Sequence, residues 1–75
     1  MTEEQLLAII NELLIDEGED ELDSLDMSFH LKNDIGFDSM TLAHLTVMIE
    51  NECGVDIFAD GLVNTVQEVY DKVNR

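Results

Sequence analysis

The feature that most constrains the fold is the near absence of residues that break helices. The chain has no proline and only four glycines among its 75 residues, whereas an all-β sandwich needs turn residues after every short strand. A chain of this length buries about 60% of its extended surface, which supports one small core. We therefore expect a single all-α domain spanning residues 1–75.

Two stretches of apolar residues recur at the spacing of one helical face and carry clear boundary signals. Thr2-x-x-Gln5 fits a capping box, which predicts a first helix near residues 3–16. Asp38 is a good N-cap and Gly54 is a good terminating residue, so a second helix is expected between them.

The remaining segments predict a last helix, a short helix and a long loop. Thr65-x-x-Glu68 is a second capping box that precedes another apolar stripe. Residues 55–64 are interrupted by Asp60-Gly61 and have room for only a turn or two of helix. Seven acidic side chains between residues 16 and 26 begin a long first loop. The expected fold is a small four-helix bundle, with three main helices and a short third helix.

The net charge excludes several classes of partner. Eighteen acidic residues against three lysines and arginines give a formal charge of −15, which repels nucleic acid and anionic membranes and attracts proteins with basic patches. The start of the chain, residues 1–4, is acidic and unlike a targeting peptide, and no apolar stretch approaches the roughly 20 residues of a membrane span. We expect a cytoplasmic monomer that binds neither nucleic acid nor membrane.

The single cysteine, Cys53, has no partner for an internal disulfide. It continues the apolar stripe of the second helix, a position where a small buried side chain is common. We expect a structural core residue in preference to a reactive thiol.

The segment from Gly36 to Met40 places the Ser39 hydroxyl group in the first turn of a helix. Unpaired backbone N–H groups and the helix dipole would stabilise a phosphate ester at that oxygen. Neither His30 nor His44 can be assigned as its base, so the chain is not expected to be an enzyme, and another enzyme would have to activate Ser39. Local chemistry leaves open the alternative that Asp38 and Ser39 merely cap a helix.

A longer pattern around Ser39 resembles the core signature of acyl carrier proteins. Residues 31–40 read Leu-Lys-Asn-Asp-Ile-Gly-Phe-Asp-Ser-Met, where the family pattern reads L-x-x-D-L-G-x-D-S-L. Further matches are Leu45, Ile49, Glu50, the run Gly54-Val55-Asp56-Ile57 and the pair Thr65-Val66. The resemblance covers nearly the whole chain in length, charge and helix order.

The resemblance implies a discrete carrier on which 4′-phosphopantetheine, transferred from coenzyme A to Ser39, holds acyl groups as thioesters. It also implies two kinds of partner: a phosphopantetheinyl transferase and acyl-processing enzymes with basic docking patches. The candidate contact residues, chosen by position, are Asp38, Met40, Thr41, His44 and Val47. The candidates for lining an acyl pocket, for which plain core packing is an equal explanation, are Leu45, Ile49, Val63 and Val66.

The sequence departs from the family pattern at several positions. His44 and Thr41 stand where the family often has acids, and most of the negative charge lies in the first loop. Phe58 replaces an expected proline after Ile57. These departures favour a dedicated pathway, such as a polyketide, aminoacyl or specialised lipid system, over general fatty-acid synthesis. Acyl cargo is the expectation.

Two alternatives come from other functional classes. An EF-hand-like calcium-binding domain fits a small acidic chain, and Asp56 and Asp60-Gly61 match part of that loop. However, Phe58 occupies position 3, which needs an oxygen ligand, and Gln67 replaces the bidentate glutamate of position 12, so no metal site is expected. The other alternative is an unmodified helical adaptor domain.

Overall fold

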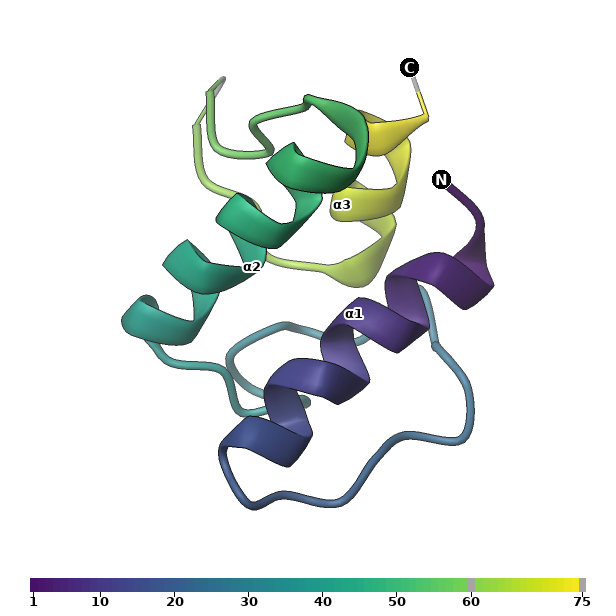
Figure 1. Ribbon diagram of the computed structural model, residues 1–75, viewed down its shortest axis with the longest axis vertical. Helices are drawn as coiled ribbons and strands as arrows, with labels where there is room; N and C mark the ends of the chain where they lie inside the picture. Colours follow the sequence, from purple (N-terminus) through teal and green to yellow (C-terminus); the bar gives the residue numbers. More distant parts are fainter. Residues whose placement is uncertain (60, 75) are drawn as a thin grey trace.

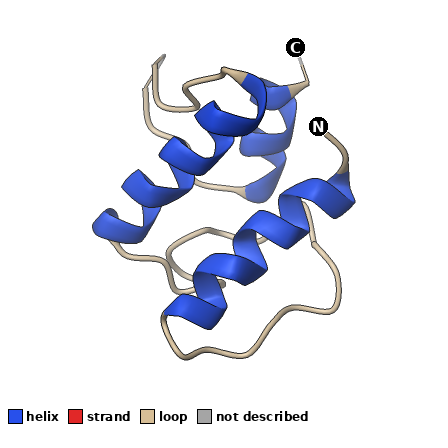
Figure 2. Cartoon of the chain, viewed as in Figure 1, coloured by secondary structure: helices blue, strands red, loops and turns tan. Residues whose placement is uncertain are grey.

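The computed structural model describes residues 1–59 and 61–74, within which three helices are joined by loops (Figure 1, Figure 2). The helices are α1 (Glu3–Asp16), α2 (Ser39–Cys53) and α3 (Val66–Val73). No strand occurs in the described residues, so the predicted all-α class is confirmed there. The first and last described residues lie close together, because the Met1 ammonium group donates a hydrogen bond to Asn74 Oδ1 at 3.0 Å. None of these helices combines the length and apolar character needed to cross a bilayer.

Capping groups set the helix boundaries, as the sequence predicted. The Gln5 N–H donates to Thr2 Oγ1 at 3.1 Å, and the Thr2 N–H donates to Gln5 Oε1 at 2.8 Å. Thr65 and Glu68 form the same reciprocal pair at the start of α3. Gly54 ends α2 with a φ of 72°, a left-handed conformation that costs glycine little. The predicted range 3–16 agrees with α1.

The short third helix predicted within residues 55–64 is not found in the described part of that segment, so the four-helix count is not confirmed. Asp56 closes a single turn in which its carboxylate accepts from the Phe58 N–H at 3.0 Å. The Asp56 carbonyl oxygen accepts from the Ala59 N–H at 3.2 Å. Gly61 follows with a φ of 129°, outside the helical range. An Asx turn and a glycine thus leave no room for a helix to propagate; Asp60 lies outside the described residues.

The long loop, residues 17–38, follows the course shown in Figure 1, and hydrogen bonds fasten it to α1 and to the start of α3. Asn11 of α1 holds the backbone of Leu22 twice: its Nδ2 donates to the carbonyl at 3.0 Å, and its Oδ1 accepts from the N–H at 2.7 Å. Further along, His30 pairs with Thr65 in an isolated antiparallel bridge. The loop is therefore ordered by long-range contacts, although it has no regular structure of its own.

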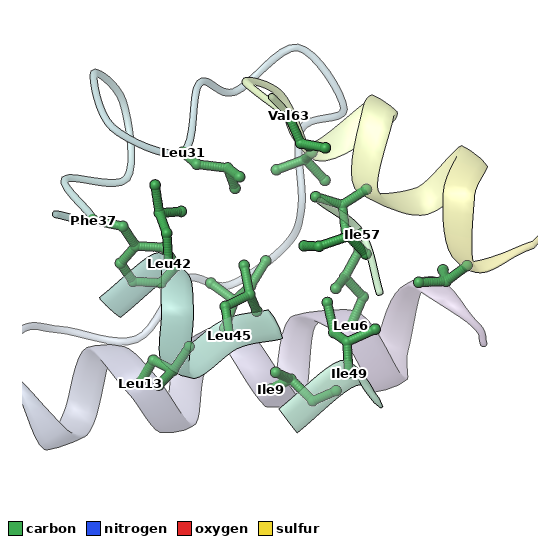
Figure 3. Packing of buried hydrophobic residues seen from close by; sticks show 14 of the residues in the cluster. Leu6, Ile9, Leu13, Leu31, Phe37, Leu42, Leu45, Ile49, Ile57 and Val63 are labelled. Atoms are coloured by element: carbon green, nitrogen blue, oxygen red, sulfur yellow. The ribbon is translucent and has the colours of Figure 1, made fainter. Parts of the chain in front are cut away.

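One apolar cluster lies between the helices and the two long loops (Figure 3). Phe37 belongs to it and is only 2% exposed, which fixes the end of the first loop immediately before α2. Cys53 does not belong to it, and the expectation of a buried Cys53 is wrong. The last buried residue of α2 is Ile49, so the helix runs past the edge of the core and leaves the Cys53 thiol exposed.

Candidate functional site

The site lies where the first loop enters α2. Asp38 is the N-cap, with an extended backbone, and its Oδ1 accepts from the Thr41 backbone N–H at 2.8 Å. Ser39 is the first residue of the helix, and its side chain is exposed. The hydroxyl group therefore stands at the helix end whose backbone N–H groups lack partners within the helix.

Thr41 ties this helix start to the end of α1. Its hydroxyl group donates to the carboxylate of Glu17, the residue that caps the C-terminus of α1, and also lies 3.0 Å from Asp38 Oδ1. Glu17 and Thr41 are 24 positions apart, so no local sequence pattern announces the contact. Thr41 is only 8% exposed and offers a partner little surface; its role in partner contact remains a prediction.

The electrostatics of the cap follow from these donors. The Thr41 backbone N–H, followed by its hydroxyl group, lowers the pKa of Asp38 below its ordinary value. Both donors favour the ionised carboxylate, and burial acts in the opposite direction. The cap therefore depends on a charge that acid removes.

We expect the wild type to lose stability on acidification in a step that the Asp38→Asn variant lacks. Because the folded pKa is lowered, the stabilisation is fully present above the unfolded pKa of about 3.9 and is lost as pH falls through the folded pKa. Asparagine also caps helices, so the variant is expected to fold normally at neutral pH. Melting temperatures of the two proteins, compared from about pH 7 to about pH 2, measure the effect. Parallel curves through that window would contradict it.

A hollow of about 270 Å³ opens beside Ser39, between the start of α2 and the loop that follows it. Its lining residues are Lys32, Ser39, Leu42, Ala43, Phe58, Leu62, Val63 and Asn64. Leu42 and Ala43 are three and four positions after Ser39, so helical geometry places all three on one side of α2. This spacing could have identified Leu42 and Ala43 from the sequence. Phe58 and Leu62 could not be found in this way, because they come from a segment without periodicity.

The four predicted acyl-pocket residues separate into two groups. Val63 lines the hollow beside Ser39. Leu45, Ile49 and Val66 are completely buried in the apolar cluster and do not line the hollow. As the structure stands, these three side chains pack the core.

Four of the five predicted contact residues lie on the surface near the start of α2. Met40 is 84% exposed and Val47 is 54% exposed, and Asp38 and His44 are exposed as well. Positions 40, 44 and 47 follow the i, i+4, i+7 spacing of one helical face. Met40, His44 and Val47 therefore share one exposed face of α2, and Asp38 lies at the N-terminal end of that helix.

The calcium-site alternative gains no support from the described residues. Within them, no three His, Cys, Asp or Glu side chains are grouped so that they could hold a metal ion. Asp56 uses its carboxylate to cap a turn, and Asp60 lies outside the described part of the chain.

Comparison with known families shows which family the whole chain resembles. A sequence model of the family described as "Phosphopantetheine attachment site" matches residues 4–73. The chain belongs to this family. A search of curated proteins gave no match. The resemblance to acyl carrier proteins is therefore confirmed, and the cofactor of the family, a covalently attached 4′-phosphopantetheine, is the predicted one. Domains of this phosphopantetheine-attachment family are non-catalytic carriers that a phosphopantetheinyl transferase modifies and processing enzymes then use.

The residues around Ser39 fit the family's cofactor. An exposed hydroxyl group gives a transferase access, and the positive end of the α2 dipole favours an anionic phosphodiester there. Lys32, one of only three lysines and arginines in the chain, lines the same hollow as Ser39 and adds a positive charge near it. Apart from Asn64, the other side chains that line the hollow are apolar and can receive an uncharged arm.

Proposed function

We propose that this protein is an acyl carrier that tethers acyl intermediates as thioesters on a phosphopantetheine arm attached to Ser39. The observation that carries the proposal is the exposed Ser39 hydroxyl group at the first turn of α2, within the segment that the family model matches. Residues 1–75 act as one carrier domain, and the chemistry on the cargo is performed by other enzymes.

Each residue of the site has a physical role in this function. Asp38 and Thr41 hold the first turn of α2, so that the Ser39 hydroxyl group is presented in one orientation. The helix terminus and Lys32 stabilise the phosphodiester charge. When bound, the phosphopantetheine group supplies a flexible thiol that forms the thioester.

Exposed residues of α2 offer both apolar and charged contacts to partner proteins. Met40 and Val47 offer exposed apolar contacts, and Asp38 offers a negative charge to basic docking patches. His44 lies on the same surface without a negative charge, which favours partners from a dedicated polyketide or specialised lipid pathway. The apolar hollow beside Ser39 favours acyl over aminoacyl cargo.

We expect the purified chain to gain one phosphopantetheine when it is incubated with coenzyme A, Mg²⁺ and a broad-specificity phosphopantetheinyl transferase. The helix start is preformed and exposed, so modification should reach completion. Intact-mass spectrometry measures the gain, and a reaction without coenzyme A is the control. The modified chain should then accept an acyl group that hydroxylamine removes, as expected of a thioester. No mass gain with several transferases would overturn the carrier function.

A further inference from the structure

Some apolar side chains of α1 lie outside the hydrophobic core. Its buried side includes Leu6, Ile10 and Leu13, which are at most 1% exposed. Beside this stripe lies Ile15, which is 55% exposed and is one of the most exposed large apolar side chains of the described chain. A second apolar strip, formed by Leu7, Ala8 and Ile15, therefore runs along α1 outside the core.

This second strip forms the floor of a groove. A hollow of about 430 Å³ is lined by Leu7, Ala8 and Ile15 from α1 and by Glu21 from the first loop. A neighbouring hollow of about 210 Å³ shares Leu7 and extends to Leu25. Together they make one depression, called here the α1 groove, that follows the 14 residues of α1 for about 20 Å.

The wall of the α1 groove is held in place by the Asn11 side chain. Both of its hydrogen bonds go to the backbone of Leu22, at 3.0 Å and 2.7 Å, and they fix the acidic loop beside the helix. Asn11 is 9% exposed, so this clamp is largely shielded from water. The groove is thus preformed by the fold.

The rim of the α1 groove is uniformly negative. Its acidic residues are Glu3, Glu4, Glu12, Asp16, Glu21 and Asp23. No lysine or arginine of the described residues lines either hollow. An apolar floor between acidic edges complements a segment with apolar side chains on one face and basic side chains on either side of it.

The α1 groove is separate from the cofactor region. The hollow beside Ser39 and the two hollows of the groove share no lining residue. A partner that contacts only the residues of the groove would therefore not cover Ser39.

We propose that the α1 groove binds a basic amphipathic helix of a partner protein. Its apolar face packs on Leu7 and Ile15, and its lysine and arginine side chains lie along the acidic rim. A carrier could then be held by a partner through α1 while Ser39 remains available to the enzymes that act on its cargo.

The test uses the full chain carrying Ser39→Ala, so that the result does not depend on phosphopantetheine attachment. The probe is a synthetic helical peptide with leucines at i, i+3, i+4 and i+7 and lysines elsewhere. We expect saturable binding, with the largest amide NMR shifts at Leu7, Ala8, Ile15 and Leu25. A peptide of identical composition in scrambled order is expected to bind at least about tenfold more weakly, because its apolar face is lost.

Two variants of equal exposure locate the contact. Ile15→Ser is expected to weaken peptide binding about tenfold. Val47→Ser is the control: Val47 lies on α2 and is 54% exposed, against 55% for Ile15. This variant should bind the peptide as tightly as the parent chain. Glu12→Gln combined with Asp16→Asn removes two rim charges and leaves the floor intact. It should weaken binding several-fold in low salt, and this difference should disappear in high salt.

The proposal is overturned by any of three results. The first is the absence of saturable binding, and the second is equal affinity for the two peptides. The third is a set of NMR shifts centred on α2, together with a loss of affinity in Val47→Ser and none in Ile15→Ser. Thermal melting of every variant accompanies the titrations, and the rim variant tests the groove even if Ile15→Ser folds poorly.

Discussion

Replacing Ser39 with alanine is expected to reduce phosphopantetheine attachment from completion to an undetectable level while the fold is retained. The substitution removes the oxygen to which the arm is attached. It leaves the helix start intact, because the cap depends on Asp38 and Thr41. Ser39 is exposed, so the free energy of unfolding should change by no more than about 0.5 kcal/mol. Intact mass after treatment with transferase and coenzyme A gives the first result, and urea unfolding gives the second.

Ser28→Ala is the matched control. The chain has three serines, and Ser28 lies in the first loop, where its hydroxyl group donates to Asp26 Oδ1 at 2.6 Å. It lies outside the helices, so the variant should be modified as completely as the wild type. If Ser39→Ala is labelled as fully as the wild type, and Ser28→Ala or Ser24→Ala is not labelled, the attachment site is in the first loop.

The helix boundaries could be read from the sequence because they depend on hydrogen bonds between residues close in the chain. The Thr2 and Gln5 pair needs only a three-residue separation, and the Asp38 cap reaches only as far as Thr41. Gly54 likewise acts through its own backbone conformation. Such signals are local, so they specify the position of Ser39 at a helix start without knowledge of the tertiary structure.

The parts that could not be read depend on contacts between distant segments. Periodicity indicates which side of α2 is apolar, but it does not indicate that the core ends at Ile49 and leaves Cys53 exposed. It also cannot distinguish a pocket wall from core packing, so Val63 and Val66 were equivalent candidates although only Val63 lines the hollow beside Ser39. The Asn11 clamp on Leu22 joins residues 11 positions apart across a loop without periodicity.

Replacing Phe37 with alanine is expected to produce the largest loss of stability of any single substitution considered for this protein. Phe37 is the largest of the fully buried side chains and is 2% exposed. Truncating a buried phenylalanine costs about 3–5 kcal/mol. A domain of this size has a total stability of about 4–11 kcal/mol at 0.05–0.15 kcal/mol per residue. The variant should therefore be marginally stable or unfolded at room temperature, as measured by urea denaturation.

Phe29→Ala is the control for this prediction, because Phe29 lies in the same loop but is only partly buried. Its loss of stability should be clearly smaller, and a cost below about 1 kcal/mol for Phe37→Ala would contradict the burial of that side chain.

The Phe37 backbone N–H also donates to the Leu31 carbonyl oxygen at 2.9 Å, so the side chain and backbone together fix the approach to Asp38. If a transferase requires the folded start of α2, the rate of modification of Phe37→Ala should fall with its folded fraction and recover when sulfate or another stabilising solute refolds the chain. A variant that is unfolded and yet modified at the wild-type rate would show that the enzyme reads the sequence around Ser39 instead of the helix start.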